Sequence, residues 1–194
     1  SEAAKDGIEL QSDQVIERYS AEEPALESGE YLPYREVLGA TAQKVAAGLG
    51  WELPPERAGF LAASLPEWRP FSDTNPALEK LAQRFRLGIL SNIDDDLLAD
   101  TREHFTVGFD LIVTAQQVRS YKPGLAHFKE GLMRAGDRLV LHAAQSYFHD
   151  VIPASKLGIP VVWVNRKGNR IPPGGPIPTH EVRTLTDLAN LLGV

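Results

Sequence analysis

The sequence has no cysteine among its 194 residues, which excludes disulfides, thiolate metal sites and cysteine nucleophiles. Long apolar runs are missing as well. None approaches the length of a bilayer span, and the polar start SEAAKDG has no signal-peptide core. We therefore expect a protein without a membrane segment. The lack of cysteine does not fix the compartment, but the cytoplasm, which is reducing, is the simpler interpretation.

Basic charge is scarce too. Lys and Arg number 20 against 26 Asp and Glu, the formal net charge is −6, and no run of Lys or Arg occurs. Nucleic acids and anionic membranes attract clustered basic residues, so we expect neither as a partner. The apolar share of 43% and the charged share of 24% are those of an ordinary globular domain.

The two sides of residue 72 differ in hydrophobic periodicity. Before it, apolar residues recur at helical spacing, and nothing alternates as a strand does. After it, short apolar runs alternate with helical patterns, and the runs are residues 87–90, 109–113, 139–141, 160–164 and 181–184. This alternation is typical of a doubly wound α/β fold, in which helices cover both faces of a parallel sheet. We predict a helical cap over residues 1–72 and an α/β core over residues 73–194.

Polar side chains follow the predicted strands at their carboxyl ends, where open α/β sheets bind ligands. They are Ser91, Asn92, Lys122 and Asp150. Taken singly, each has an ordinary structural interpretation, as a helix cap or a solvated surface group. Asp94–Asp96 suits the first turn of a helix better than a metal site, and the five histidines lack metal-ligand spacing. We therefore predict no metal site.

Three segments, taken in order, resemble motifs two to four of the haloacid dehalogenase (HAD) superfamily. They are GILSN at 88–92, SYKP at 120–123 and SYFHDVIPASKLGIPVVWVNR at 146–166. The resemblance covers almost the whole chain and is closest to the 2-haloacid dehalogenase type, whose four-helix cap the first 72 residues resemble. It implies a Rossmann-like HAD core and a two-step hydrolysis. An aspartate attacks substrate carbon, or phosphorus in a phosphatase, and water then hydrolyses the ester.

The resemblance also implies roles for individual residues. Ser91 and Asn92 match the residues that hold the substrate's anionic group, and Lys122 matches the lysine that neutralises charge around the nucleophile. Asp150 matches the acid of the fourth motif, which orients that lysine or places the hydrolytic water. Arg18, in the first cap helix, aligns loosely with the arginine that receives the leaving halide.

The first motif of the family, D-x-x-G-T with its nucleophilic aspartate, has no counterpart here. Asp6 and Asp13 are acidic, but neither follows an apolar strand. In the family this motif lies on a central strand of the sheet. We therefore expect that a natural N-terminal segment is missing, through the choice of chain ends, proteolysis or disorder. Without it, two strand edges would be left unpaired.

Two further departures concern specificity. Gln145 stands where phosphatases of the superfamily carry a Mg²⁺-binding aspartate, and a neutral amide is a poorer ligand for a hard cation. Phe128 and Tyr147 stand where characterised dehalogenases have a tyrosine and an asparagine. We place Tyr147 among the substrate-binding residues.

We predict a hydrolase that acts on a small anionic substrate through an aspartyl ester, without a cofactor. Its reaction would be halide release from a short 2-haloalkanoic acid, with Ser91, Asn92, Lys122 and Asp150 converging at one pocket between core and cap. One alternative is a Mg²⁺-dependent phosphatase of a small phosphorylated metabolite. Another is a non-catalytic HAD-like binding protein or truncated form. The oligomeric state is open, with a homodimer among the options.

Overall fold

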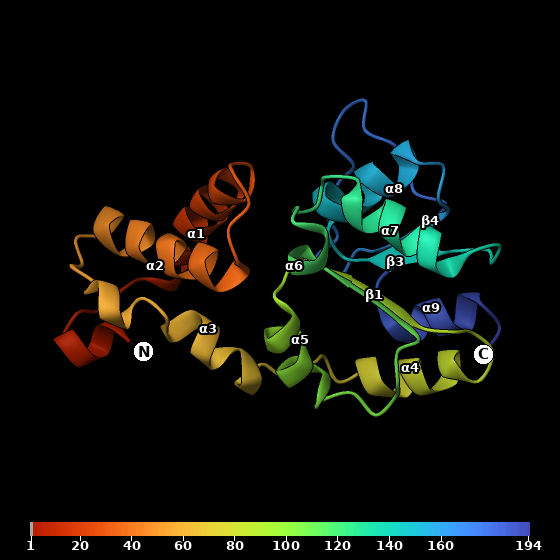
Figure 1. Ribbon diagram of the computed structural model, residues 1–194, viewed down its shortest axis with the longest axis horizontal. Helices are drawn as coiled ribbons and strands as arrows, with labels where there is room; N and C mark the ends of the chain where they lie inside the picture. The colour runs from red at the N-terminus through yellow and green to blue at the C-terminus, as the bar shows by residue number, and fades with distance from the viewer. Residues whose placement is uncertain (1) are drawn as a thin grey trace. The chain divides into compact units, whose positions relative to one another are not determined.

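The computed structural model describes residues 2–194 of the chain. The chain divides into two compact units, and each consists of two segments of the sequence (Figure 1). The first unit comprises residues 1–68 and 93–101, and the second comprises residues 69–92 and 102–194. No helix in the described part of the chain has both the length and the apolar character needed to cross a membrane.

The first unit is helical throughout its described residues. Its α-helices are α1 (Ser12–Glu27), α2 (Tyr34–Gly48), α3 (Phe60–Ser64) and α5 (Asp95–Arg102), and its 3₁₀ turns are η1 (Ala3–Asp6), η2 (Pro55–Arg57) and η3 (Leu65–Glu67). Helices α1 and α3 both pack against α2. The small core contains Ala46, Trp51 and Ala58, all at least 94% buried. The helical periodicity before residue 72 therefore corresponds to real helices.

Asp94 joins the second segment of this unit to the first. Its two carboxylate oxygens accept the backbone N–H groups of Tyr34 at 2.8 Å and of Arg35 at 3.0 Å. These groups begin α2, where Pro33 offers no capping side chain. A carboxylate at this position satisfies donors that the helix cannot. Asp94 is only 2% exposed. The acidic run thus contributes to two helices, since Asp94 caps α2 while Asp95 and Asp96 are the first residues of α5.

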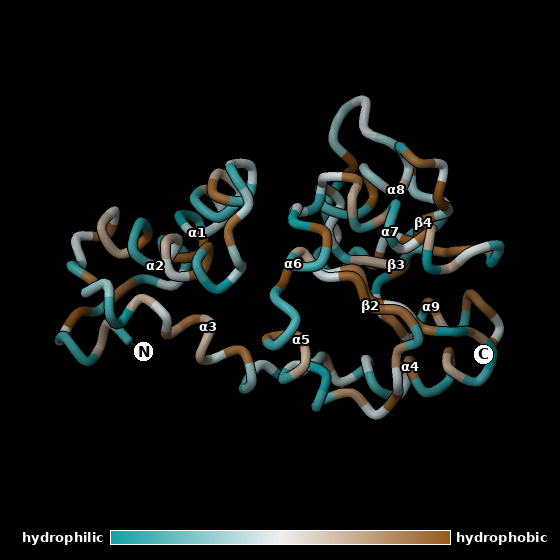
Figure 2. The backbone as a smooth tube through the Cα atoms, viewed as in Figure 1, coloured by the Kyte–Doolittle hydropathy of each residue, from teal (hydrophilic) through white to brown (hydrophobic). Residues whose placement is uncertain are grey.

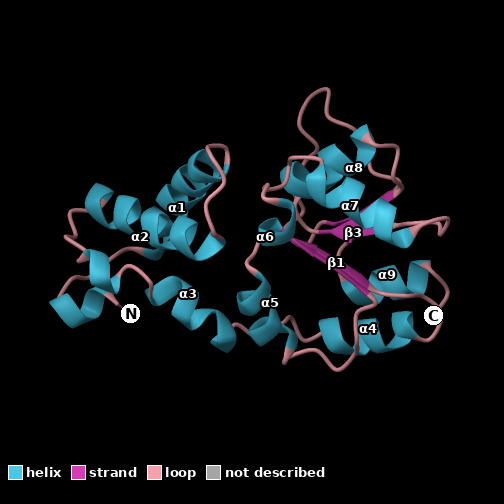
Figure 3. Ribbon diagram, in the orientation of Figure 1, coloured by secondary structure: helices cyan, strands magenta, loops and turns pink. Residues whose placement is uncertain are grey.

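The second unit is an α/β structure in which every strand pair is parallel (Figure 3). Its strands are β1 (Gly88–Ser91), β2 (Leu111–Thr114), β3 (His142–Ala144), β4 (Val161–Val164) and β5 (His180–Val182). Its helical elements are α4 (Thr74–Ala82), α6 (Ala115–Val118), α7 (Ala126–Ala135), the π-helical turn η4 (Tyr147–Val151), α8 (Ile152–Lys156) and α9 (Leu185–Leu191). The predicted α/β class with a parallel sheet is confirmed.

The strands form two sheets rather than one. β1 pairs with β2, and β4 lies between β3 and β5. A cavity of about 1240 Å³ is lined by residues of both β1 and β3, including Ile89, Leu90 and Ala143. Within residues 2–194, β1 and β3 each have a partner on one side only.

The strand predicted at residues 139–141 is misplaced. The structure puts β3 at His142–Ala144, and Leu139 and Leu141 are exposed beside the cavity. The prediction used the apolar composition of residues 139–141, but apolar side chains can also lie exposed beside a strand. The strand itself begins one residue later, at His142. β4, by contrast, is buried along its whole length, and Figure 2 shows the β2 segment in the hydrophobic colour.

Candidate active site

Lys122 and Asp150 form a buried ion pair in the second unit. Lys122 Nζ lies 2.6 Å from Asp150 Oδ1 and also donates to the Leu90 carbonyl at 3.0 Å. The lysine is 8% exposed and the aspartate 4%. Both side chains line the cavity that borders β1 and β3. The ammonium group therefore lies close to the carboxyl end of β1, where an α/β sheet binds its ligand.

Asn92 holds the backbone of Lys122. Its Oδ1 accepts the Lys122 N–H at 2.7 Å, and its Nδ2 donates to the Lys122 carbonyl at 3.1 Å. Two hydrogen bonds from one planar amide fix both the position and the direction of the loop. Asn92 thus sets where the lysine side chain starts.

His142 is a member of this cluster that the sequence did not reveal. Its Nε2 lies 2.9 Å from Asp150 Oδ1, the same oxygen that Lys122 contacts. Its ring also packs edge-on against Phe128, with centroids 5.1 Å apart. In the sequence, His142 is a polar residue followed by two alanines in a short strand. It lacks the metal-ligand spacing that would have marked it as a site residue.

The pKa of Asp150 lies below its ordinary value. Burial acts to raise it, but the hydrogen bond from His142 and the positive charge of Lys122 together outweigh burial. The carboxylate is therefore ionised at neutral pH. A buried charge needs such partners, because transfer from water is otherwise strongly unfavourable.

His127 is fully buried and lies near enough to Lys122 to be affected by its charge. Its Nε2 lies 3.1 Å from the Ser91 carbonyl. Burial, followed by the charge of Lys122, lowers the pKa of His127 to about 4. The imidazole is therefore neutral at pH 7 and donates from Nε2, since a carbonyl can only accept. His127 thereby links the end of β1, at Ser91, to α7.

These contacts bring Asn92, Lys122 and Asp150 into one cluster, and Ser91, directly before Asn92, contacts His127 through its carbonyl. Of the four predicted residues, Lys122 and Asp150 line the cavity. Tyr147 has a different environment, because its hydroxyl donates to the Pro176 carbonyl at 2.6 Å. Its ring packs against Trp163 at 5.2 Å between centroids. The hydroxyl therefore stabilises the loop after β4, and its proton is used in the hydrogen bond to Pro176. Substrate binding by Tyr147 stays a prediction.

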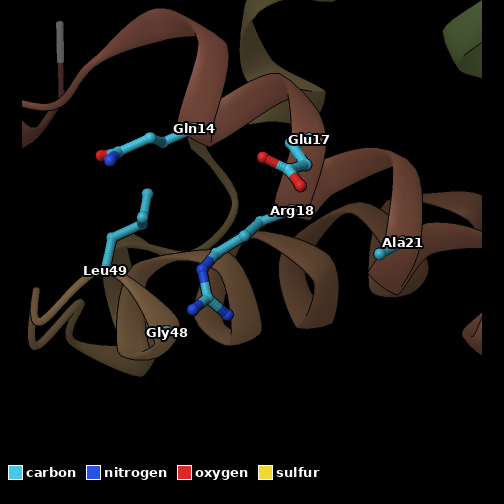
Figure 4. Close-up of a pocket in the computed structure, with 6 residues that line it drawn as sticks. All are labelled: Gln14, Glu17, Arg18, Ala21, Gly48 and Leu49. Carbon is cyan, nitrogen blue, oxygen red and sulfur yellow. The ribbon is translucent and has the colours of Figure 1, made fainter.

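Arg18 belongs to the helical unit and lines a separate cavity of about 610 Å³ with Gln14, Glu17 and residues of α2. Figure 4 shows its guanidinium reaching from α1 toward Gly48. A side chain at residue 48 would collide with that group, so glycine gives the arginine its room. The halide-binding role of Arg18 likewise stays a prediction.

Neither N-terminal acid is placed as a nucleophile would be. Asp6 accepts hydrogen bonds from Trp51 Nε1 at 2.8 Å and from Arg57 Nη1 at 2.7 Å, and Asp13 lies in the first turn of α1. Within residues 2–194, Asp150 is the one carboxylate in hydrogen-bond contact with Lys122.

The cluster does not fit the magnesium ion that the phosphatase alternative implies. In the part of the chain that the structure describes, no three His, Asp or Glu side chains are grouped so as to hold a metal. The Gln145 side chain is exposed. The groups nearest Asp150 are an ammonium and an imidazole N–H, which complement an anion rather than a cation.

The chain is similar over most of its length to several known proteins. The chain is 25% identical to an (S)-2-haloacid dehalogenase of Pseudomonas putida over 170 residues, which are 84% of this chain and 74% of the relative. An L-2-haloacid dehalogenase of Xanthobacter autotrophicus, solved with chloropropionic acid covalently bound, matches at TM-score 0.83 and 19% identity, over 98% of this chain and 90% of that one.

A third similar protein is a HAD hydrolase of Bacillus subtilis in a magnesium-bound form, at TM-score 0.83 and 19% identity. The match covers 100% of this chain and 88% of that hydrolase. No family model matches the chain. These similarities agree with the resemblance of the chain's motifs and support a haloacid dehalogenase-like hydrolase with the HAD fold.

Proposed function

We propose that this hydrolase releases halide from a short 2-haloalkanoic acid through an aspartyl ester. The observation that carries the proposal is the buried Lys122 ammonium, held by Asp150 beside a cavity of about 1240 Å³. A fixed cation in a site of low dielectric stabilises both an attacking carboxylate and the carboxylate of the substrate. The curated relative from P. putida has this activity in its name.

The proposed reaction has two steps. A carboxylate oxygen attacks C2 of the haloacid, the carbon–halogen bond breaks, and its electron pair leaves with the halide. Water then adds to the ester carbonyl while Asp150 accepts its proton. That proton passes to the departing 2-hydroxy group, and the regenerated carboxyl group loses its own proton to solvent. Lys122 balances the negative charge in both steps.

The attacking carboxylate would enter through the space between the two sheets. Ile89 and Leu90 on β1 and Ala143 on β3 line the cavity there. A strand paired with both edges would run parallel to them. Its carboxyl end would then lie at the edge of the sheet where Lys122 is held. We propose that the nucleophilic aspartate occupies the end of such a strand.

The remaining parts of the proposal concern the surroundings of this site. The helical residues 1–72 act as its cap, with Arg18 receiving halide and Tyr147 contacting substrate, as the family resemblance implies. The substrate is a free small anion rather than a nucleic acid, in keeping with a net charge of −6. We place the protein in the cytoplasm, and a homodimer is consistent with this function.

Product analysis tests the reaction directly. In the full-length protein, with the N-terminal segment that is expected to carry the nucleophile, halide release from 2-chloropropionate is compared with phosphate release from p-nitrophenyl phosphate, each with Mg²⁺ and with EDTA. The proposal expects halide in both conditions and no phosphate. Lys122→Ala should abolish the release, whereas Lys156→Ala, on the exterior of α8, should not.

A magnesium-dependent phosphatase is the second candidate, and the magnesium-bound neighbour favours it. Phosphate release that requires Mg²⁺, without halide, would establish it in place of the dehalogenase. If neither product forms from any 2-haloacid or phosphate ester, the non-catalytic interpretation takes precedence.

A further inference from the structure

The shared oxygen of Asp150 sets His142 apart from the other histidines. Lys122 Nζ and His142 Nε2 contact the same atom, Oδ1, at 2.6 and 2.9 Å. No residue of the described range 2–194 donates a hydrogen bond to Oδ2. Asp150 also lines the cavity. One oxygen of the carboxylate is thus held by two donors, and the other has none.

The two donors differ in rigidity. Lys122 reaches Oδ1 at the end of a flexible four-carbon side chain. His142 projects from β3, and its ring is kept in place by the Phe128 ring at 5.1 Å. Because the ring of His142 is held by packing, its N–H restricts the orientation of the carboxylate plane in a way that the ammonium contact alone does not.

From this geometry we propose that His142 is a positioning residue, which anchors Asp150 through Oδ1 and keeps Oδ2 as the oxygen that accepts the proton of the hydrolytic water. The inference deepens the proposed function and rests on it for the identity of the reaction. His142 does not touch the substrate. It acts through Asp150, and its Nε2–H is the part of the imidazole that the role requires.

The charged and titratable groups around Asp150 come from three elements. Lys122 precedes α7, His142 lies on β3, and His127 lies on α7. Lys122 is retained in the test variants, and His127 stays neutral at pH 7 because its pKa is about 4. Loss of the His142 donor therefore leaves one cation and the burial of the site. Burial acts to raise the pKa of Asp150.

The test compares three variants at one position. His142→Gln keeps an N–H close to the place of Nε2, His142→Leu removes it, and His142→Asn is polar but too short to reach. In ¹³C spectra of protein labelled at aspartate carboxyls, the Asp150 signal is assigned by its loss in Asp150→Asn. We expect its titration midpoint to rise by about one pH unit or more in the Leu and Asn variants. In the Gln variant it should stay near the parent value.

Turnover supplies the second readout. In the full-length protein, with the segment that is expected to carry the nucleophile, kcat for 2-chloropropionate should fall about tenfold or more in the Leu and Asn variants while KM changes little. The Gln variant should keep most of kcat. His180→Leu, on the exposed strand β5, is the control for loss of a strand histidine. An unchanged Asp150 titration in a folded Leu or Asn variant would overturn the inference. Absence of halide release in the parent would instead count against the proposed function, and the titration would still decide the role of His142.

Discussion

Asn92 holds Lys122 by its backbone and not by its charge, with hydrogen bonds of 2.7 and 3.1 Å to the N–H and C=O groups of a residue 30 positions later. The charge of the lysine is instead held by Asp150 and by the Leu90 carbonyl. Position and charge are thus fixed by separate partners, and mutations can separate the two.

Replacing Asn92 with alanine should displace Lys122 while leaving its charge. Both backbone groups lose a partner, so we expect the free energy of unfolding to fall by about 2 kcal/mol. Activity should fall as well, without a change in net charge. Urea denaturation measures the first effect. Asn190→Ala, on the exposed side of α9, is the control and should change stability by less than about 0.5 kcal/mol.

Lys122→Met should be more damaging to stability than the double variant Lys122→Met/Asp150→Leu. The single change leaves a buried carboxylate with His142 as its remaining donor, which costs about 3 kcal/mol or more. The double change removes both charges. A double-mutant cycle by denaturation measures the coupling, and additive effects of the two changes would contradict a tight ion pair.

His127 should make the protein sensitive to mild acid. Its imidazole takes up a proton near the ordinary pKa of 6.5 when unfolded, but only near 4 when folded. Between these values the unfolded state binds more protons, so stability is full above about pH 6.5 and is lost as the pH falls toward 4. The loss from this residue amounts to about 3 kcal/mol. His127→Gln should flatten the pH profile of the melting temperature, and His180→Gln should leave it steep.

Asp94 should be the most important acid of its run for the stability of the helical unit. Asp94→Ala removes the acceptor of two backbone N–H groups at the start of α2. We expect a loss of about 1–2 kcal/mol. Asp100→Ala, on the exposed face of α5, is the matched control. Equal melting temperatures of the two variants would show that Asp94 does not cap α2.

Halide release by the full-length protein, with the segment that is expected to carry the nucleophile, should persist in EDTA. Displacement of a halide by a carboxylate develops less charge than phosphoryl transfer, for which a cation is generally needed. Lys122 supplies the positive charge in the first case. Initial rates with 2-chloropropionate, before and after dialysis against EDTA, should agree within a factor of about two, since Lys122 is part of the chain and the chelator cannot remove it. A rate restored only by Mg²⁺ would mean that a metal takes part.

The sequence was enough for the α/β class and for the proximity of Asn92, Lys122 and Asp150, whose catalytic roles stay a prediction. Each follows an apolar run, and the carboxyl ends of parallel strands share one edge. It was not enough for His142, because the contact with Asp150 depends on the turn η4 between them. The sequence also did not place β3, because it does not distinguish exposed leucines before a strand from buried leucines within one.

The cap on α2 also required three dimensions. Asp94 lies some 60 residues after the helix that it caps, and periodicity carries no information about such a partner. Local signals predicted the acidic start of α5 instead, which is also correct. Asp94 thus fits the local pattern of acids at the start of α5, although its two hydrogen bonds are made with the start of α2.

The two-part composition of the helical unit constrains the order of events on the ribosome. Residues 1–68 leave the exit tunnel before residue 94, which carries the capping carboxylate of α2 and follows the whole of β1. Because synthesis proceeds at about 5–20 residues per second, α2 stays without its cap for seconds. The helical unit therefore cannot complete its folding until residue 94 has been made, and its maturation is tied to the synthesis of β1, the first strand of the other unit.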